Sequence, residues 1–330
     1  SVQHPFPLMR VHKVYAKKDA IWAFTVVGRP PQEDTSFGQL IHEITGDAIP
    51  QEIPGLKSVH AVDAAGVHPL LLAVGSERYT PYTPTKQPAE LLTIANHILG
   101  TGQLSLAKFL FITGSDTNDI DAQDTLSFMT YLLERINFSR DVHFYTNTTM
   151  DTLDYSGTSI NSGSKVVFAA YGDKIRTLTG TVPTVLNTLE GFGNGHLAMP
   201  GVVCITAAAY TNAQDAEAQV NQLNAQLSTA NEALAGTAII VLCDDADFTA
   251  QTLNNYLWVT YTRSNPSHDI YGIGAFTQNK HWGCTGPLVI DARIKPHHAP
   301  VLIKDEAVEK RVDQLFEKGG SLYSLSSTQV

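Results

Sequence analysis

The sequence predicts an α/β fold made of two repeated three-layer units, each with a mainly parallel or mixed β-sheet. Short apolar runs with strand character lie at 69–74, 108–112 and 142–145 in the first half of the chain. Segments with helical spacing separate such runs, and strands separated by helices normally pair in parallel through right-handed crossovers. A similar set of elements follows in the second half, which indicates that one unit occurs twice.

In the first unit, helices are expected at 88–99 and 121–136. Leu91 and Ala95 follow the spacing of one helical face, and Gly100 is typical of a residue that ends a helix. The apolar strand runs are continuous and do not alternate with polar residues. This pattern favours a sheet that is covered by helices on both faces.

In the second unit, strands are expected at 201–206, 238–242 and 269–273, with a long helix at 213–234. The apolar stripe of that helix consists of Val220, Leu223, Leu227 and Leu234. A final amphipathic helix is expected at 304–317.

Four parts of the chain follow from these patterns. Residues 1–175 are predicted to form the first domain, and residues 176–199, rich in threonine and glycine with little periodicity, a linker. Residues 200–320 are predicted to form the second repeat. Residues 321–330 are expected to be a loose tail.

The strongest sign of duplication is a gapless internal match at an offset of 128 residues. The matched positions are Ala122, Gln123, Phe128, Arg135, Asn137, Ser139 and Asp141 in the first half, and Ala250, Gln251, Tyr256, Arg263, Asn265, Ser267 and Asp269 in the second. Chance similarity between two βαβ units is the alternative. We expect an ion pair or hydrogen bond between Arg135 and Asp141, and another between Arg263 and Asp269, each fixing a loop.

A rigid loop follows the first apolar run of the chain. The run Ile21–Val27 stops at Gly28-Arg29-Pro30-Pro31, and an acidic pair, Glu33 and Asp34, comes next. Two prolines fix φ and remove two backbone donors, so this turn cannot lie inside a strand or a helix. Open α/β folds form their binding sites in loops at the carboxyl ends of strands. An ordinary strand–loop–helix junction is the alternative.

Three segments near the start of the chain closely resemble the UbiD family in order and spacing. They are Phe6-Pro7-Leu8-Met9-Arg10-Val11-His12-Lys13-Val14, Asp19-Ala20-Ile21 and Thr25-Val26-Val27-Gly28-Arg29-Pro30-Pro31-Gln32-Glu33. A further stretch, from Asp151-Thr152-Leu153-Asp154-Tyr155 through Gly163-Ser164-Lys165, looks like the end of the family's C-terminal domain. UbiD proteins are decarboxylases of aromatic and α,β-unsaturated acids, and they use a prenylated flavin mononucleotide (FMN).

The resemblance implies that the chain is the C-terminal portion of a longer UbiD-like protein. In the family, the flavin, its divalent metal (Mn²⁺) and the catalytic acid are held by a part that precedes the Phe-Pro segment. This chain starts at Ser1, just after the place of the acidic motif. The catalytic residues are therefore expected upstream of residue 1, and no cofactor or metal ligand is expected within the chain. The missing N-terminal flavin-binding domain becomes an expected partner.

The same resemblance implies four substrate-binding residues, Arg29, Glu33, Thr35 and Phe37, in the pocket-wall loop 28–38. Phe37 is expected to pack against the apolar body of a planar acid, and Thr35 to offer a hydroxyl. Arg29 and Glu33 are expected to hold the loop in place.

The predicted function is thus that of a prenylated-FMN-dependent, non-oxidative decarboxylase of an aromatic or α,β-unsaturated acid, such as a quinone precursor. The fragment alone is expected to be inactive. The alternative is a non-catalytic oligomerisation module of a UbiD-like protein. A homo-oligomer is expected in both cases.

The composition excludes several other classes of protein. With 43% hydrophobic and 16% charged residues the chain is typical of a globular protein, and a net charge of −10 argues against nucleic acid as a partner. No apolar stretch is long enough to span a bilayer, and residues 1–20 show no leader pattern, so a cytoplasmic location is expected. Cys204, Cys243 and Cys284 are too few and too widely spaced for a disulfide framework.

Two acidic clusters follow predicted strands. They are Asp116, Asp119, Asp121 and Asp124 in the first unit, and Asp244, Asp245 and Asp247 in the second. Carboxylates at a sheet edge are able to bind Mg²⁺ or Ca²⁺. Capping of the following helices is the interpretation favoured here.

Overall fold

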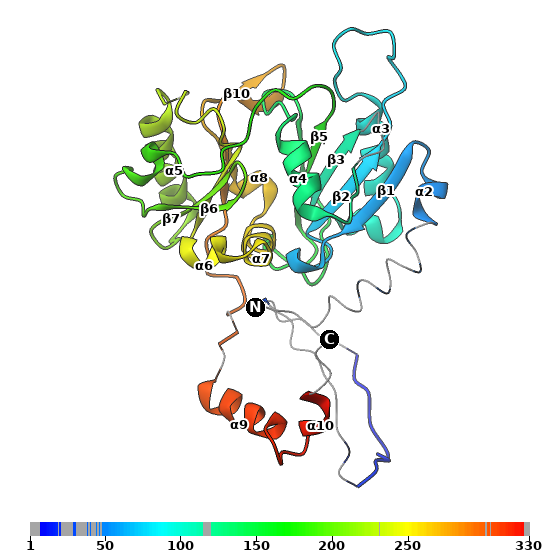
Figure 1. Cartoon of the computed structure of the whole chain (residues 1–330). Coiled ribbons are helices and arrows are strands. Elements are labelled where there is room, and N and C mark those ends of the chain that lie inside the picture. The colour runs from blue at the N-terminus through cyan, green and yellow to red at the C-terminus, as the bar shows by residue number, and fades with distance from the viewer. Residues whose placement is uncertain are drawn as a thin grey trace. The chain divides into compact units, whose positions relative to one another are not determined.

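The structure is a computed structural model of the 330-residue chain (Figure 1). The residues that it describes are 7–18, 20, 29–30, 38, 40, 44, 46, 48–114, 120–230, 232–300, 302–303 and 305–326. The chain divides into two compact units, residues 1–299 and residues 300–330. The larger unit contains the predicted first domain and residues 200–299 of the predicted second repeat.

The first repeat contains a five-stranded mixed sheet with the strand order β1-β2-β3-β5-β4. Its strands are β1 (Leu56–Ala61), β2 (Leu70–Gly75), β3 (Phe109–Gly114), β4 (Val142–Thr148) and β5 (Gly163–Ala170). The three central strands run parallel to one another. The two edge strands, β1 and β4, are antiparallel to their neighbours.

The second sheet repeats this topology strand for strand, with the order β6-β7-β8-β12-β9. Its strands are β6 (Gly195–Met199), β7 (Val202–Thr206), β8 (Ile239–Cys243), β9 (Ile270–Gly272) and β12 (Leu288–Asp291). Again the three central strands are parallel and both edges are antiparallel. The predicted α/β fold with two repeated units is therefore confirmed.

Two details of the prediction are wrong. The strands expected at 142–145 and 269–273 are antiparallel edge strands, β4 and β9, and the third parallel strand of each sheet is β5 or β12. No helix of the predicted length precedes β5 or β12, so the helix-then-strand pattern did not reveal them. The predicted linker 176–199 also includes β6 and the short helix η3 (Thr184–Asn187), which belong to the second repeat.

The helices of the larger unit surround both sheets. They are α2 (Ile49–Glu52), η1 (Asp63–Ala65), α3 (Glu90–Leu99), η2 (Gly102–Leu106), α4 (Thr125–Leu133), α5 (Ala213–Leu227), α6 (Ala246–Gln251), α7 (Leu253–Arg263) and α8 (Pro266–Asp269). A hairpin of β10 (Ala275–Gln278) and β11 (His281–Cys284) completes it. The smaller unit contains α9 (Glu306–Phe316) and α10 (Tyr323–Ser326). Within the described residues, none of the helices has the length and apolar character needed to cross a membrane.

Each sheet has an outer helix and an inner helical layer. Leu91, Ile94 and Ile98 of α3 pack on β2, β3 and β5, whereas Val220 and Leu223 of α5 pack on the second sheet. Figure 1 shows α3 and α5 on the two outer faces, with α4 and α7 between the sheets.

The two repeats share the inner layer. The ring of Tyr261, from α7, lies edge-on to Phe109 and Phe111 of β3, with centroid distances of 5.0 and 5.9 Å. Its hydroxyl lies 3.2 Å from that of Tyr256. All four side chains are fully buried, so the first sheet and the second repeat have a common hydrophobic core.

The duplicated motif has the same role in both repeats. Asp141 Oδ2 accepts a hydrogen bond from the main-chain N–H of Asn137 (2.9 Å), and Asp269 Oδ2 accepts one from that of Asn265 (2.6 Å). Each aspartate therefore closes the turn that leads from a helix into an edge strand. The internal sequence match marks equivalent turns.

The predicted arginine–aspartate pairs, however, do not form. The observed ion pairs are Arg135 with Glu134, Asp141 with Arg140, Arg263 with Asp244, and Asp269 with Lys295. Each motif arginine lies over an aromatic ring from the helix that precedes it (Arg135) or ends with it (Arg263). Arg135 lies 3.4 Å from the centroid of Tyr131, and Arg263 lies 4.9 Å from that of Trp258.

Each motif loop also contacts the other repeat. Ser164 of β5 donates its N–H to Asn265 Oδ1 (3.1 Å), and its hydroxyl accepts from the N–H of Ser267 (2.8 Å). In the reverse direction, the N–H of Cys284 in β11 donates to the carbonyl of Phe138 (3.2 Å). The motif therefore lies at the junction between the repeats.

Candidate functional site

Of the four predicted substrate-binding residues, the structure describes Arg29. Glu33, Thr35 and Phe37 lie outside the described residues, and their roles stay predictions. Arg29 is exposed, and its guanidinium lies over the ring of Phe248, 4.2 Å from the centroid. The described part of the pocket-wall loop therefore contacts the second repeat.

Phe248 belongs to an aromatic and cationic group at the carboxyl edge of the second sheet. Its helix, α6, begins directly after β8, and its ring lies edge-on to Trp258 of α7 at 6.3 Å. The guanidinium of Arg263 lies over the ring of Trp258. We call Arg29, Phe248, Trp258 and Arg263 the arginine–aromatic cluster. A guanidinium on an aromatic face keeps its planar hydrogen-bonding edge available for a carboxylate.

The acidic residues after β8 hold this cluster. Asp244 Oδ2 accepts from Arg263 Nη1 (3.2 Å) and from the N–H of Ile294 (2.9 Å). Burial lowers the pKa of Arg263, Asp244 opposes this, and the nearby Arg29 lowers it further. Asp244 thus pairs with Arg263, while Arg29 is close enough to Arg263 to act on its pKa.

The acidic clusters are used for helix capping where the structure describes them. Asp245 accepts from the N–H of Phe248 at the start of α6 (3.0 Å), and Asp124 accepts from the N–H of Ser127 at the start of α4 (3.1 Å). Asp116 and Asp119 lie outside the described residues. For Asp124 and Asp245, the capping interpretation is confirmed.

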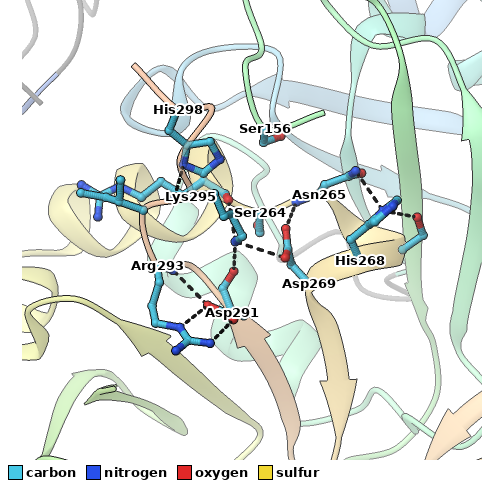
Figure 2. A network of polar contacts seen from close by, with 12 residues as sticks. Ser156, Ser264, Asn265, His268, Asp269, Asp291, Arg293, Lys295 and His298 are labelled. Atoms are coloured by element: carbon cyan, nitrogen blue, oxygen red, sulfur yellow. Dashed lines mark hydrogen bonds and ion pairs between the residues drawn. The ribbon is translucent and has the colours of Figure 1, made fainter. Parts of the chain in front are cut away.

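Behind the cluster lies a buried polar network (Figure 2). Asp291 and Arg293 form a two-pronged ion pair, with Nε to Oδ1 at 2.9 Å and Nη2 to Oδ2 at 2.6 Å. Arg293 Nη1 also donates to the carbonyl of Ala208 (2.7 Å) and to the side chain of Gln219. Burial alone would lower the pKa of Arg293, but its bonds to Asp291 raise it above the usual value.

Lys295 connects this ion pair to the motif loop. Its Nζ contacts Asp269 Oδ1 (3.1 Å) and donates to the carbonyls of Asp291 (2.8 Å) and Arg263 (3.2 Å). Burial raises the pKa of Asp269, although Lys295 opposes this. The network fixes residues 291–295 and, through the Arg263 carbonyl, the end of α7.

A second buried lysine extends the polar region into the first repeat. Lys108 Nζ contacts Asp154 Oδ2 (2.7 Å) and donates to Ser156 Oγ (2.7 Å). Burial lowers the pKa of Lys108, and Asp154 opposes the shift. Asp154 belongs to the second segment that resembles the UbiD family, so that segment supplies a structural carboxylate.

Sequence reasoning did not single out Asp291, Arg293 and Lys295. They alternate after the apolar residues of β12, which places all three on one side of an extended chain. Charged residues at alternate positions after a buried strand are the sequence pattern that would have predicted this network.

Lowering the pH below the usual pKa of histidine, 6.5, is expected to destabilise the protein through His298. Burial, then Lys295 and His297, lower the pKa of His298 to about 3. Between these two values the unfolded chain binds a proton that the folded chain does not, so stability is lost as the pH falls. Allowing for partial exposure, His298→Gln should remove about 1 kcal/mol of the loss between about pH 7 and pH 5.

Urea unfolding at several pH values measures this effect. His12→Gln, at an exposed position, is the matched control. The His12 variant should keep the pH dependence of the parent. If the His298 variant keeps it as well, His298 is not the cause of the loss of stability.

The described residues include no group of three or more His, Cys, Asp or Glu side chains able to hold a metal ion. In the glycine-rich segment 191–195, the N–H of Gly193 donates to Thr206 O (2.8 Å) and that of Gly195 to Asn187 Oδ1 (2.9 Å), so these amides are not available to a phosphate. Cys284 is buried, which raises its pKa to about 12 and leaves its thiol protonated.

Comparison with known proteins identifies the class. The family model of the 3-octaprenyl-4-hydroxybenzoate carboxy-lyase C-terminal domain matches residues 35–170. A subunit of the 4-hydroxybenzoate decarboxylase of Chlamydia pneumoniae is 32% identical over 314 residues, which cover 95% of this chain and 50% of that protein. An uncharacterised protein of Chlamydia trachomatis is 32% identical over 312 residues, covering 94% of this chain and 50% of its own length.

Residues 35–170 match that C-terminal domain, and the second sheet repeats the topology of the first. The chain is thus similar to a UbiD-type decarboxylase C-terminal domain and, over nearly its whole length, to half of the chlamydial subunit. It spans about half the length of the curated relatives that it matches. Among solved structures, the vanillic acid decarboxylase of Sedimentibacter hydroxybenzoicus has a TM-score of 0.32 and 16% identity, covering 41% of this chain and 26% of that one.

Proposed function

We propose that the chain is the C-terminal part of a decarboxylase that removes CO₂ from an aromatic or α,β-unsaturated acid and depends on prenylated FMN and Mn²⁺. The other part of the longer protein holds the flavin, the metal and the catalytic acid. This chain supplies one wall of the acid's pocket, the loop 28–38. A quinone precursor is the proposed substrate class, and a homo-oligomer in the cytoplasm is the proposed form.

The observation that carries this proposal is the contact between Arg29 and the second repeat. Arg29 lies on Phe248, and Phe248 is fixed by Trp258 and α6. The second repeat therefore holds Arg29, a described residue of the proposed pocket-wall loop, through a cation–π contact. Support of this kind holds a substrate in a reactive geometry, and small displacements of such a wall reduce the rate strongly.

The test is CO₂ release from 4-hydroxybenzoate by the longer protein, reconstituted with prenylated FMN and Mn²⁺. Arg29→Met should lower kcat/KM by about tenfold, since a cation–π contact contributes on the order of 1 kcal/mol. Arg311→Met, in the exposed helix α9, is the matched control and should leave the rate unchanged. No CO₂ release from a panel of aromatic and unsaturated acids would refute the proposal.

A further outcome concerns the chain alone. Residues 1–330 are proposed to bind neither prenylated FMN nor Mn²⁺ tightly, because the resemblance places their ligands in the other part of the protein. A stoichiometric flavin absorbance, or Mn²⁺ retained after dialysis, would show that the cofactor site has been misplaced.

The alternative function is assembly, and α9 favours it. Val308, Val312 and Leu315 form a stripe along this helix, and each is between 41% and 49% exposed. A second copy of the chain is the proposed occupant of that stripe. Two results together would support the assembly function. In light scattering, Val312→Asp/Leu315→Asp should convert an oligomer to a monomer. In the CO₂-release assay, the longer protein should show no decarboxylase activity.

A further inference from the structure

A small cavity of 130 Å³ lies where the two repeats meet, at the amino ends of β8 and β12. The motif loop of the first repeat, the segment after β5, and the segments before β8 and β12 all contribute to its lining. The lining residues are Phe138, Arg176, Leu234, Ala235, Thr237, Thr285, Gly286 and Pro287. The arginine–aromatic cluster lies at the opposite, carboxyl edge of the second sheet, so the cavity is a separate feature.

The volume of the cavity limits what it can hold. A molecule of liquid water occupies about 30 Å³, so the space suits about four waters or one small ion. Sites for drug-sized molecules have about 300 Å³ or more, which excludes aromatic acids and nucleotides. Thr237 is buried, whereas Ala235 and Thr285 are exposed, so the cavity is open to solvent on one side.

Arg176 brings a positive charge to this cavity. Its Nη1 donates to the carbonyl of Leu133 (2.5 Å), and its guanidinium lies 5.2 Å from the centroid of the Phe138 ring. Burial lowers the pKa of Arg176, and it forms no ion pair with any residue in the described part of the chain. The other nitrogens of the fork therefore remain available to an acceptor in the cavity.

The acidic residues near Arg176 are paired with other cations. Glu134, whose carbonyl accepts from the Arg176 N–H, directs its carboxylate to Lys174 (2.8 Å). Asp141 is paired with Arg140 (2.5 Å). A partly buried charge without a counter-ion is unfavourable, so this guanidinium is suited to bind an anion.

Two threonines add hydroxyl donors to the same cavity. Thr237 is 4% exposed, and its Oγ1 is buried without a hydrogen-bond partner among the described residues. Buried hydroxyls in native proteins nearly always have a partner in protein, water or ligand. Thr285 Oγ1 has one long contact, of 3.5 Å, with the carbonyl of Gly274. The main-chain amides of Thr285 and Gly286 are already bonded to carbonyls, so side chains are the donors left for a bound molecule.

We propose that this cavity binds a small inorganic oxyanion, such as phosphate, between the Arg176 guanidinium and the hydroxyls of Thr237 and Thr285. The guanidinium supplies the charge and a planar fork of donors, and each hydroxyl supplies one more. The ion would join the segment after β5 to the segments before β8 and β12, and so stabilise the junction of the repeats. The inference does not rest on the proposed decarboxylase function.

The experiment titrates residues 1–330 with sodium phosphate, with sodium chloride keeping the ionic strength constant. Binding is followed by ³¹P NMR and by the thermal unfolding midpoint. A saturable rise of the midpoint is expected, because an ion that binds the folded chain stabilises it by mass action. Phosphate also stabilises proteins through its exclusion from their surface, but that effect does not saturate and does not depend on Arg176.

The decisive variant is Thr237→Val, which keeps the shape of the side chain and removes the hydroxyl that has no partner. In chloride alone it should not lower the unfolding midpoint, and yet it should weaken phosphate binding about tenfold, as expected for a hydrogen bond to a charged group. Arg176→Lys keeps the charge, loses the planar fork and should weaken binding by about the same factor. Thr93→Val, at an exposed position of α3, is the matched control and should bind as the parent does.

Two results would overturn the proposal. One is a phosphate affinity that is the same in the Thr237→Val, Arg176→Lys and Thr93→Val variants. The other is the absence of saturable binding by the parent. Neither result depends on decarboxylase activity, so the two proposals fail separately.

Discussion

Arg293→Met is expected to lower the free energy of unfolding by about 4 kcal/mol, because it leaves the Asp291 carboxylate buried without its cation. Both residues are 0% exposed. The substitution also removes the donor to the Ala208 carbonyl. Removing one partner of a buried pair costs far more than the pair itself contributes, since a charge in a medium of low polarity has no water to replace the lost partner.

Urea unfolding of residues 1–330 measures this loss. The double variant Asp291→Leu/Arg293→Met removes both charges and should be less destabilised than Arg293→Met alone. Arg311→Met, on the exposed face of α9, should change stability by less than about 0.5 kcal/mol. A midpoint for Arg293→Met equal to that of Arg311→Met would show that Asp291 keeps another partner or is reached by water.

The second large effect is expected at Tyr261, where the repeats share their core. Tyr261→Ala should cost about 4 kcal/mol, because it removes a fully buried ring from between Phe109 and Phe111 and leaves a cavity. Tyr261→Phe keeps the ring and loses the contact with the Tyr256 hydroxyl, at a cost of about 1 kcal/mol.

The same variant tests whether the repeats unfold together. Because Tyr261 belongs to the second repeat and packs on the first sheet, Tyr261→Ala should shift one common transition seen by fluorescence and by circular dichroism. Two separate transitions, only one of them shifted, would show that the repeats are independent domains.

The duplication could be predicted from the sequence because a turn needs particular residues. Asn137 and Asp141, like Asn265 and Asp269, recur since the aspartate closes the turn through the asparagine N–H. The partners of the arginines could not be predicted. Their choice depends on aromatic rings one turn earlier in each helix, and the two repeats use different rings and different carboxylates.

The strand directions show a similar limit. The apolar runs at β2, β3, β7 and β8 were visible because they are continuous and lie before helices. β5 follows an irregular segment and β12 follows a hairpin. Their parallel pairing with β3 and β8 therefore depends on the burial of apolar side chains from distant parts of the sequence, and local patterns do not predict it. The buried network had a signal in the alternating charges of residues 291–295. The cavity at the amino ends of β8 and β12 had no sequence signal, because its lining comes from segments far apart in the sequence, from Phe138 to Pro287.

The central claim is that the loop 28–38 forms a wall of the substrate pocket in a UbiD-like decarboxylase. The measurement that tests it most directly is kcat/KM for decarboxylation of 4-hydroxybenzoate by the longer protein with Phe37→Ala. The account predicts a loss of about tenfold or more, because it assigns the Phe37 ring to contact with the bound acid. Phe316→Ala, in exposed α9, should leave kcat/KM unchanged. An active Phe37→Ala enzyme with the parent's kcat/KM would contradict the account.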